Sequence, residues 1–118
     1  MDKKILKDYE CMKIEKRDAE ERIKSIEQQL ERSYPDCKEK NEILMVRKEQ
    51  YKNLILDLEK MIGEVETFIN NVEQSRMRII LKLRYIDGKT WNKIAKILGK
   101  GYTADAVRKE HDRYLGNN

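Results

Sequence analysis

The chain of 118 residues is poor in the residues that build β-barrels, disulfide scaffolds and metal centres. It contains 5 glycines, 1 proline, 2 cysteines and 1 histidine, and aromatic residues make up only 7% of it. So few glycines and prolines argue against the many tight turns of a sandwich or barrel. Cys11 and Cys37 lie far apart and, with His111 alone, cannot supply the repeated ligand pairs of a zinc site. We therefore expect two reduced thiols, no metal and no cofactor.

Long apolar runs are also missing. No segment approaches the ~20 apolar residues of a membrane span, and the charged start at residues 1–4 does not suggest a signal peptide. Charged residues make up 41% of the chain and hydrophobic residues 39%, which excludes a large buried core. This composition, rich in Lys, Glu, Ile and Leu, predicts an all-α protein without a membrane partner.

The first 30 residues carry a heptad pattern typical of a long helix. Its seam, with alternating steps of four and three and one polar interruption, consists of Ile5, Tyr9, Met12, Lys16, Ala19, Ile23, Ile26 and Leu30. Asp2 can cap the start of this helix. Pro35 should end it near residues 33–36, because proline disfavours helical dihedrals in the residue before it and lacks a backbone donor.

A second helix should begin around residues 38–41 and carry two neighbouring apolar stripes. One comprises Leu44, Lys48, Tyr51, Ile55, Leu58, Ile62, Val65, Ile69 and Val72, and the other Leu54, Leu58, Met61, Val65, Phe68 and Val72. Residues 1–72 are thus predicted to form an antiparallel, coiled-coil-like hairpin. The apolar face of residues 51–72 is wider than the first helix can cover. It predicts a homodimer or higher homo-oligomer, with folding of residues 76–98 over it as the alternative.

Residues 73–118 are predicted to form a separate unit of three shorter helices. The boundaries of these three helices follow from residue type. Serine and threonine stand at the candidate N-cap positions, and a glycine is placed to take a left-handed conformation at a helix end. The expected elements are Ser75 capping 76–86, Thr90 capping 91–98 before Gly99, and Thr103 capping 104–115. The alternative for Ser75 is a position inside one helix that continues from Val72. Three short helices with a glycine-containing turn between the last two are the layout of a helix-turn-helix unit.

The last helix should bury one face and expose the other to DNA. Ala104, Val107, His111 and Tyr114 follow steps of three and four and are expected to face inward, with Ile94 and Leu98 of the preceding helix. The opposite face offers Asp105, Arg108, Lys109, Asp112 and Arg113, while Lys93, Lys96 and Lys100 are expected near the phosphate backbone. Arg108 is the best candidate for a bidentate guanine contact. Residues 73–118 hold 11 Lys/Arg against 5 Asp/Glu, a net charge of +6, whereas residues 1–72 carry −2.

These residues also resemble a known family. The stretch from Leu83 to Gly99, followed by residues 103–108, resembles the helix-turn-helix of sigma factor region 4, in the version found in phage and prophage regulators of the RinA/ArpU type. The turn at residues 99–102 is about two residues longer than in sigma region 4 itself, so promoter recognition is not carried over. The resemblance implies a transcriptional regulator of phage genes that binds double-stranded DNA in the cytoplasm of a bacterial host.

Two other functions are compatible with a helical hairpin joined to a helix-turn-helix unit. A small terminase-like packaging protein also joins a helix-turn-helix to an oligomerising helical part, although usually in the reverse order and as a ring. A coiled-coil adaptor could instead contact RNA polymerase through its sigma-like unit. An enzyme is not expected: no residues are predicted to be catalytic, because the chain has no phosphate-binding loop and no nucleophile spaced to pair with His111.

Overall fold

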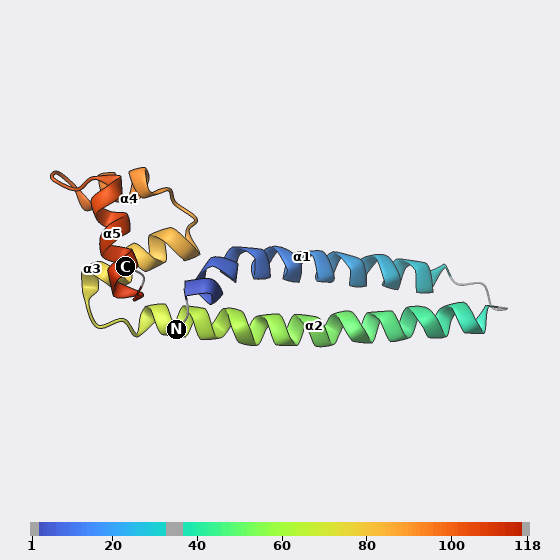
Figure 1. Cartoon of the computed structure of the whole chain (residues 1–118). Coiled ribbons are helices and arrows are strands. Elements are labelled where there is room, and N and C mark those ends of the chain that lie inside the picture. Colours follow the sequence, from blue (N-terminus) through green and yellow to red (C-terminus); the bar gives the residue numbers. More distant parts are fainter. Residues whose placement is uncertain (1–2, 33–36, 117–118) are drawn as a thin grey trace. The chain divides into compact units, whose positions relative to one another are not determined.

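The computed structural model describes residues 3–32 and 37–116, and within these ranges the chain is all-α, without a strand. The elements are α1 (Lys3–Glu31), α2 (Lys38–Asn70), α3 (Ser75–Leu81), the π-helical segment η1 (Lys82–Ile86), α4 (Trp91–Leu98) and α5 (Ala104–Tyr114) (Figure 1). The predicted cap at Asp2 and helix end at residues 33–36 lie outside the described residues. None of the described helices is long and apolar enough to cross a membrane.

The chain folds into two compact units, and their boundary crosses both long helices. Met12–Ile62 forms one unit; the first turns of α1, up to Cys11, join the chain from Gly63 onward in the other. The boundary expected between the hairpin of residues 1–72 and the unit of residues 73–118 falls in the connection between α2 and α3. The second unit therefore holds, besides α3 to α5, parts of both long helices.

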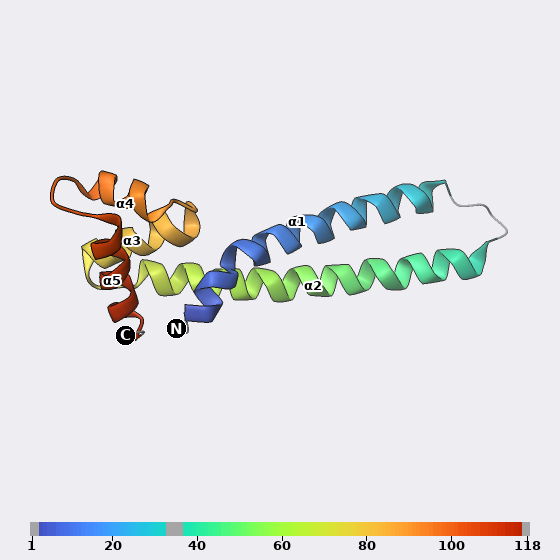
Figure 2. The same cartoon turned by 45° about the horizontal axis from the view of Figure 1, so that its top comes forward.

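In the unit of residues 12–62, α1 and α2 run antiparallel as a hairpin (Figures 1 and 2). Its buried side chains fall on the predicted seams and comprise Met12, Ala19, Ile26, Leu44 and Leu58. The polar interruption of the first seam has a partner, since the Lys16 amine lies 3.8 Å from Glu20 of its own helix and 3.5 Å from Glu59 of α2. A long lysine side chain can lie along an apolar seam while its amine reaches a carboxylate at the edge.

The other unit shows one error in the predicted seam. Ile5 is 42% exposed, whereas Leu6 and Tyr9 are buried at 0% and 2%. The reason is that the first turns of α1 belong to the unit containing residues 63–118, so they need not continue the hairpin register. Burial, together with the nearby carboxylate of Glu66, raises the pKa of Tyr9 to about 12.

The helix starts in the C-terminal region are set by local sequence. The Thr90 hydroxyl accepts a hydrogen bond from the amide of Lys93, and the Thr103 hydroxyl from the amide of Ala106, which confirms both predicted caps. Ser75 does not act as a cap: it is the first residue of α3, and the residue before it, Gln74, makes no side-chain cap hydrogen bond. Gly99 ends α4 with φ 108° and ψ −167°. The predicted positive φ is present, but this ψ lies outside the left-handed helical region, in a conformation that is essentially restricted to glycine.

The predicted single helix of residues 76–86 changes its winding midway. From Lys82 to Ile86 it is π-helical, and the amide of Asp87 donates to the carbonyl of Lys82, five residues earlier, at 3.0 Å. A π-turn of this kind inserts one extra residue into a helical turn, and such turns are frequent at functional sites. Here it places Arg84 and Tyr85 immediately before the turn that leads into α4.

Candidate nucleic-acid interface

Helix α5 rests on its neighbours through a small buried face. Val107 is 0% and His111 1% exposed, and on α4 Ile94 and Ala95 are buried as well. Ala104 is partly buried, so three of the four predicted inward residues are buried or partly buried. The fourth, Tyr114, is 41% exposed; as the last residue of α5 it lines a surface groove beside Phe68 and Val72 and does not enter the core.

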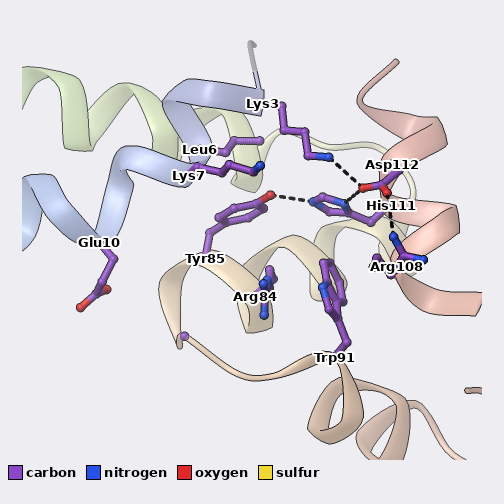
Figure 3. A pocket seen from close by; sticks show the side chains of 11 residues that line it. Lys3, Leu6, Lys7, Glu10, Arg84, Tyr85, Trp91, Arg108, His111 and Asp112 are labelled. Atoms are coloured by element: carbon purple, nitrogen blue, oxygen red, sulfur yellow. Dashed lines mark hydrogen bonds and ion pairs between the residues drawn. The ribbon is translucent and has the colours of Figure 1, made fainter. Parts of the chain in front are cut away.

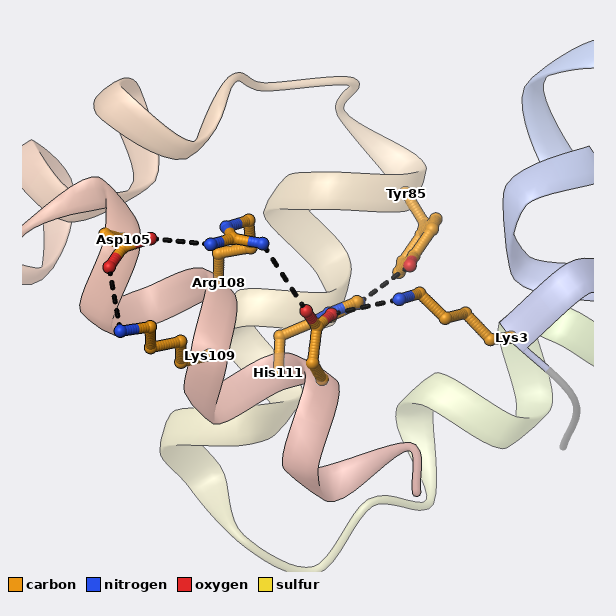
Figure 4. A network of polar contacts seen from close by, with 7 residues as sticks. Lys3, Tyr85, Asp105, Arg108, Lys109 and His111 are labelled. Carbon is orange, nitrogen blue, oxygen red and sulfur yellow. Dashed lines mark hydrogen bonds and ion pairs between the residues drawn. The ribbon is translucent and has the colours of Figure 1, made fainter. Parts of the chain in front are cut away.

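The outward face of α5 carries the cations that the sequence places there, and two of them, Arg108 and Lys109, are ion-paired with Asp105 on the same face. Arg108 donates to the carboxylate of Asp105 at 2.6 Å, and the amine of Lys109 lies 3.1 Å from the same carboxylate (Figure 4). These hydrogen bonds hold the pKa of Asp105 below its usual value, and Asp105 raises the pKa of Arg108. Because all three side chains are exposed, a phosphate or a base edge can compete for the two cations.

Asp112 is directed away from this exposed face. Its carboxylate lies 3.1 Å from the amine of Lys3, 2.9 Å from Nδ1 of His111 and 3.9 Å from the guanidinium of Arg108 (Figure 3). Burial works to raise the pKa of Asp112, but the hydrogen bonds from His111 and Lys3 outweigh it, and the pKa is lowered. Asp112, one of the predicted DNA contacts, therefore joins the start of α1 to α5.

His111 is the buried polar centre of the unit. Its Nε2 atom lies 2.7 Å from the hydroxyl of Tyr85, and the edge of its ring meets Trp91 with 4.8 Å between centroids. An ionised carboxylate can only accept hydrogen bonds, so Nδ1 of His111 donates to Asp112 and Nε2 of the neutral ring accepts from Tyr85. Burial lowers the pKa of His111, against the opposing effect of Asp112, which favours this neutral form.

Lysines of α4 and the following turn form the second part of the predicted interface. Lys93, Lys96 and Lys100 are exposed, as is Arg113 near the end of α5. Within residues 3–32 and 37–116 none of these four side chains has an ion-pair or hydrogen-bond partner. Their charges are therefore available to an external anion, unlike those of Arg108 and Lys109.

A contact that the sequence analysis did not find holds the turn between α4 and α5. Arg76 of α3 donates to the hydroxyl of Tyr102 at 3.0 Å and to the carboxylate of Glu110 at 2.7 Å. Tyr102 lies in the turn and Glu110 on α5, so one guanidinium links three elements. These residues are 26 and 34 positions from Arg76, and no local pattern indicates such a pairing.

Local sequence patterns also give no indication of the roles of Tyr85, Arg84 and Lys3. The guanidinium of Arg84 lies over the ring of Trp91 at 4.4 Å and donates to the carbonyl of Lys89. A buried histidine at an inward position of α5 does indicate that a polar partner is needed, but not which residue supplies it. No protein-family model, curated protein or solved structure matches this chain.

The arrangement can present a helix with exposed basic side chains to a polyanion. The hydrogen bonds of neutral His111 hold the buried face of α5, and Arg76 holds the turn before this helix. Exposed basic side chains lie on α4, the turn and α5. Arginine and lysine on such a surface can contact phosphates, and an arginine on a helix in the major groove can reach a guanine edge.

Proposed function

We propose that the protein is a sequence-specific DNA-binding transcriptional regulator of phage or prophage genes. The observation that carries this proposal is the division of α5 into a buried face, Val107 and His111, and an exposed face with Arg108, Lys109 and Arg113. A recognition helix needs that division, because it must be held by the protein on one side while the other enters the major groove. The family resemblance of residues 83–108 supports the same conclusion.

In this proposal the two sets of cations have different roles. Lys93, Lys96 and Lys100 have no internal partners, so they neutralise phosphates and provide affinity for any duplex. Arg108 must exchange its contact with Asp105 for a contact with a base edge, and this exchange is favourable only where a guanine offers two acceptors. Asp105 then acts against binding at other sequences, which adds specificity without adding affinity.

Selection of bound duplexes from a random pool, followed by titration of the full chain against the selected and a scrambled site, tests this function. We expect an enriched motif containing guanine, and affinity that falls steeply with salt. Equal binding to both duplexes would argue against a sequence-specific regulator. Binding that requires added RNA polymerase would favour the adaptor, and a ring-sized assembly would favour the packaging protein.

We propose in addition that the hairpin mediates self-association. Large apolar side chains of residues 12–62 remain between 42% and 63% exposed, namely Ile14, Ile43, Met45, Val46, Leu56 and Met61. So much exposed apolar surface on a small helical unit supports an interface with another copy. Two copies of the chain would bring two DNA-binding units to one operator, which raises the overall affinity.

A further inference from the structure

A cavity of about 420 Å³ lies between the first turns of α1, η1 and α5 in the unit that contains residues 63–116 (Figure 3). Four cationic side chains line it, Lys3, Lys7, Arg84 and Arg108, against two carboxylates, Glu10 and Asp112. With His111 neutral, the lining has a net charge of +2. A volume in this range fits a small organic molecule rather than a bare inorganic ion.

The two carboxylates do not cancel the field of the cavity. Asp112 is already engaged by Lys3 and by His111, at 3.1 and 2.9 Å. Glu10 points away from the other labelled side chains (Figure 3). The net positive charge of the lining favours an anionic ligand over a neutral one.

Two of the four cationic side chains, Lys7 and Arg84, have hydrogen-bond donors that no described residue uses. The amine of Lys7 has no partner among the described residues, and Arg84 donates only one hydrogen bond within that part of the chain, to the carbonyl of Lys89. The planar guanidinium can donate two parallel hydrogen bonds to a phosphate or carboxylate, and the lysine adds a point charge. Their positions come from different elements, since Lys7 lies on α1 and Arg84 on η1.

The π-helical winding of η1 is a second, independent feature of the same cavity. Arg84 and Tyr85 are neighbours within η1, yet both line the cavity. Trp91 and Tyr85 add aromatic surface to the wall, which suits a ligand that has a flat ring beside its charged group.

We propose that this cavity binds a small phosphorylated molecule, with a phosphate monoester between Lys7 and Arg84 and an organic ring against the aromatic wall. A phosphate monoester carries a charge of about −1.5 to −2 at neutral pH, which matches the cavity, whereas a phosphodiester of DNA carries only −1. Nucleoside monophosphates have both the charge and the ring.

Occupancy of the cavity should alter DNA binding, and this step rests on the proposed function. Arg108 lines the cavity and also lies on the exposed face of α5. A phosphate in the cavity competes with Asp105 and Asp112 for its guanidinium and adds negative charge beside the DNA-binding face. The ligand is therefore an inhibitor of DNA binding in this scheme.

Isothermal titration of the full chain, without DNA, tests the binding step with adenosine 5′-monophosphate as the probe. We expect binding at millimolar concentrations or below, none with adenosine at matched ionic strength, and affinity about tenfold weaker in Lys7→Ala. Lys7 is the preferred position for this substitution because its side chain is exposed. Its removal leaves no partner among the described residues unpaired. Arg84→Lys, which keeps the charge and removes the fork, should also weaken binding, whereas Lys52→Ala on α2 is the charge-matched control. Helicity and thermal melting establish that each variant is folded.

The outcomes separate this inference from the proposed function. The absence of a binding heat with the nucleotide would overturn the cavity proposal and leave DNA binding intact. Loss of duplex binding in Lys7→Ala without nucleotide binding by the parent chain would mean that a DNA phosphate occupies the cavity, so a free ligand would be wrong. If the nucleotide binds, it should weaken duplex binding by about fivefold or more; unchanged duplex affinity would overturn the coupling through Arg108.

Discussion

The hydroxyl of Tyr85 donates to Nε2 of His111 across 2.7 Å, and this hydrogen bond joins η1 to α5. Burial raises the pKa of Tyr85 to about 12, with a smaller opposing effect of Arg84, so the phenol stays protonated and can donate. The donor is matched to a neutral acceptor ring, which in turn donates to Asp112. The direction of this hydrogen bond at the proposed recognition helix thus depends on the protonation state of one histidine.

Tyr85→Phe should lower the free energy of unfolding by about 1–3 kcal/mol, because it leaves Nε2 of His111 buried without a donor. Tyr114→Phe is the matched control, since that ring is 41% exposed and its hydroxyl has no partner among the described residues. Urea titrations of the two variants and the parent chain measure the effect. Equal stability of all three proteins would mean that the hydrogen bond to His111 contributes nothing.

Stability should fall as the solution is acidified from pH 7 toward pH 5. The pKa of His111 is lowered in the folded state by burial, against Asp112 and together with the charges of Lys3 and Arg84, while the unfolded chain keeps the usual value of 6.5. The unfolded state therefore binds more protons in this range, so stability is fully present above about pH 6.5 and is lost below it. His111 is the only histidine, and its imidazole resonances report its titration directly. An apparent pKa of 6.5 or higher would contradict the prediction.

Arg108→Ala should reduce the preference for the selected site over a scrambled duplex by roughly tenfold or more, because the guanine contact is lost while Asp105 remains. Lys96→Ala should weaken binding to both duplexes about equally and lower the salt slope by about one. Lys60→Ala on α2 provides a control for the loss of one positive charge. If Lys96→Ala changed the site preference and Arg108→Ala did not, α5 would not be the recognition helix.

The full chain should sediment as a dimer or larger, and Met61→Glu should shift it toward the monomer. Met61 is 42% exposed and lies in the stripe expected to exceed the cover of α1. A charge at this position opposes burial against a second copy but costs little in a monomer. A parent chain that is monomeric at tens of micromolar would refute self-association, and an unshifted Met61→Glu assembly would place the interface elsewhere.

Gly63→Ala should raise the free energy of unfolding by up to about 1 kcal/mol. Gly63 lies inside α2, and a Cβ atom there would meet nothing within 4 Å. The substitution gains helix propensity without steric cost, which a thermal melt can detect. Destabilisation would indicate that an intermolecular contact approaches the backbone at this glycine.

Features that depend on neighbouring residues were predictable from the sequence. The caps at Thr90 and Thr103 need only an amide three residues later, and the start of α2 at Lys38 follows from the heptad pattern. Burial of Val107 and His111 follows from helical periodicity alone. In contrast, serine is as typical an N-cap residue as threonine, so Ser75 was as good a candidate as Thr90. In the structure the N-cap position is taken by Gln74, whose backbone is extended.

Features that depend on tertiary contacts were not predictable. Leu6 and Ile5 are equally apolar, and the choice between them is made by the unit that the first turns of α1 join. Lys3 and Asp112 are 109 positions apart, and nothing local to either residue indicates the pair. The π-turn could not be predicted either, because Lys82–Ile86 has the composition of an ordinary helix.

The π-turn also makes this region sensitive to chain length, in addition to residue identity. A helix advances by about 100° per residue, so one residue more or less in η1 rotates everything that follows relative to α3. Deleting a single residue between Lys82 and Ile86 would remove the extra residue of the π-turn, whereas inserting one would rotate the start of α4 relative to α3. Homologous chains would then be expected to keep the number of residues in this segment, as well as the side chains of Arg84 and Tyr85 that make its contacts.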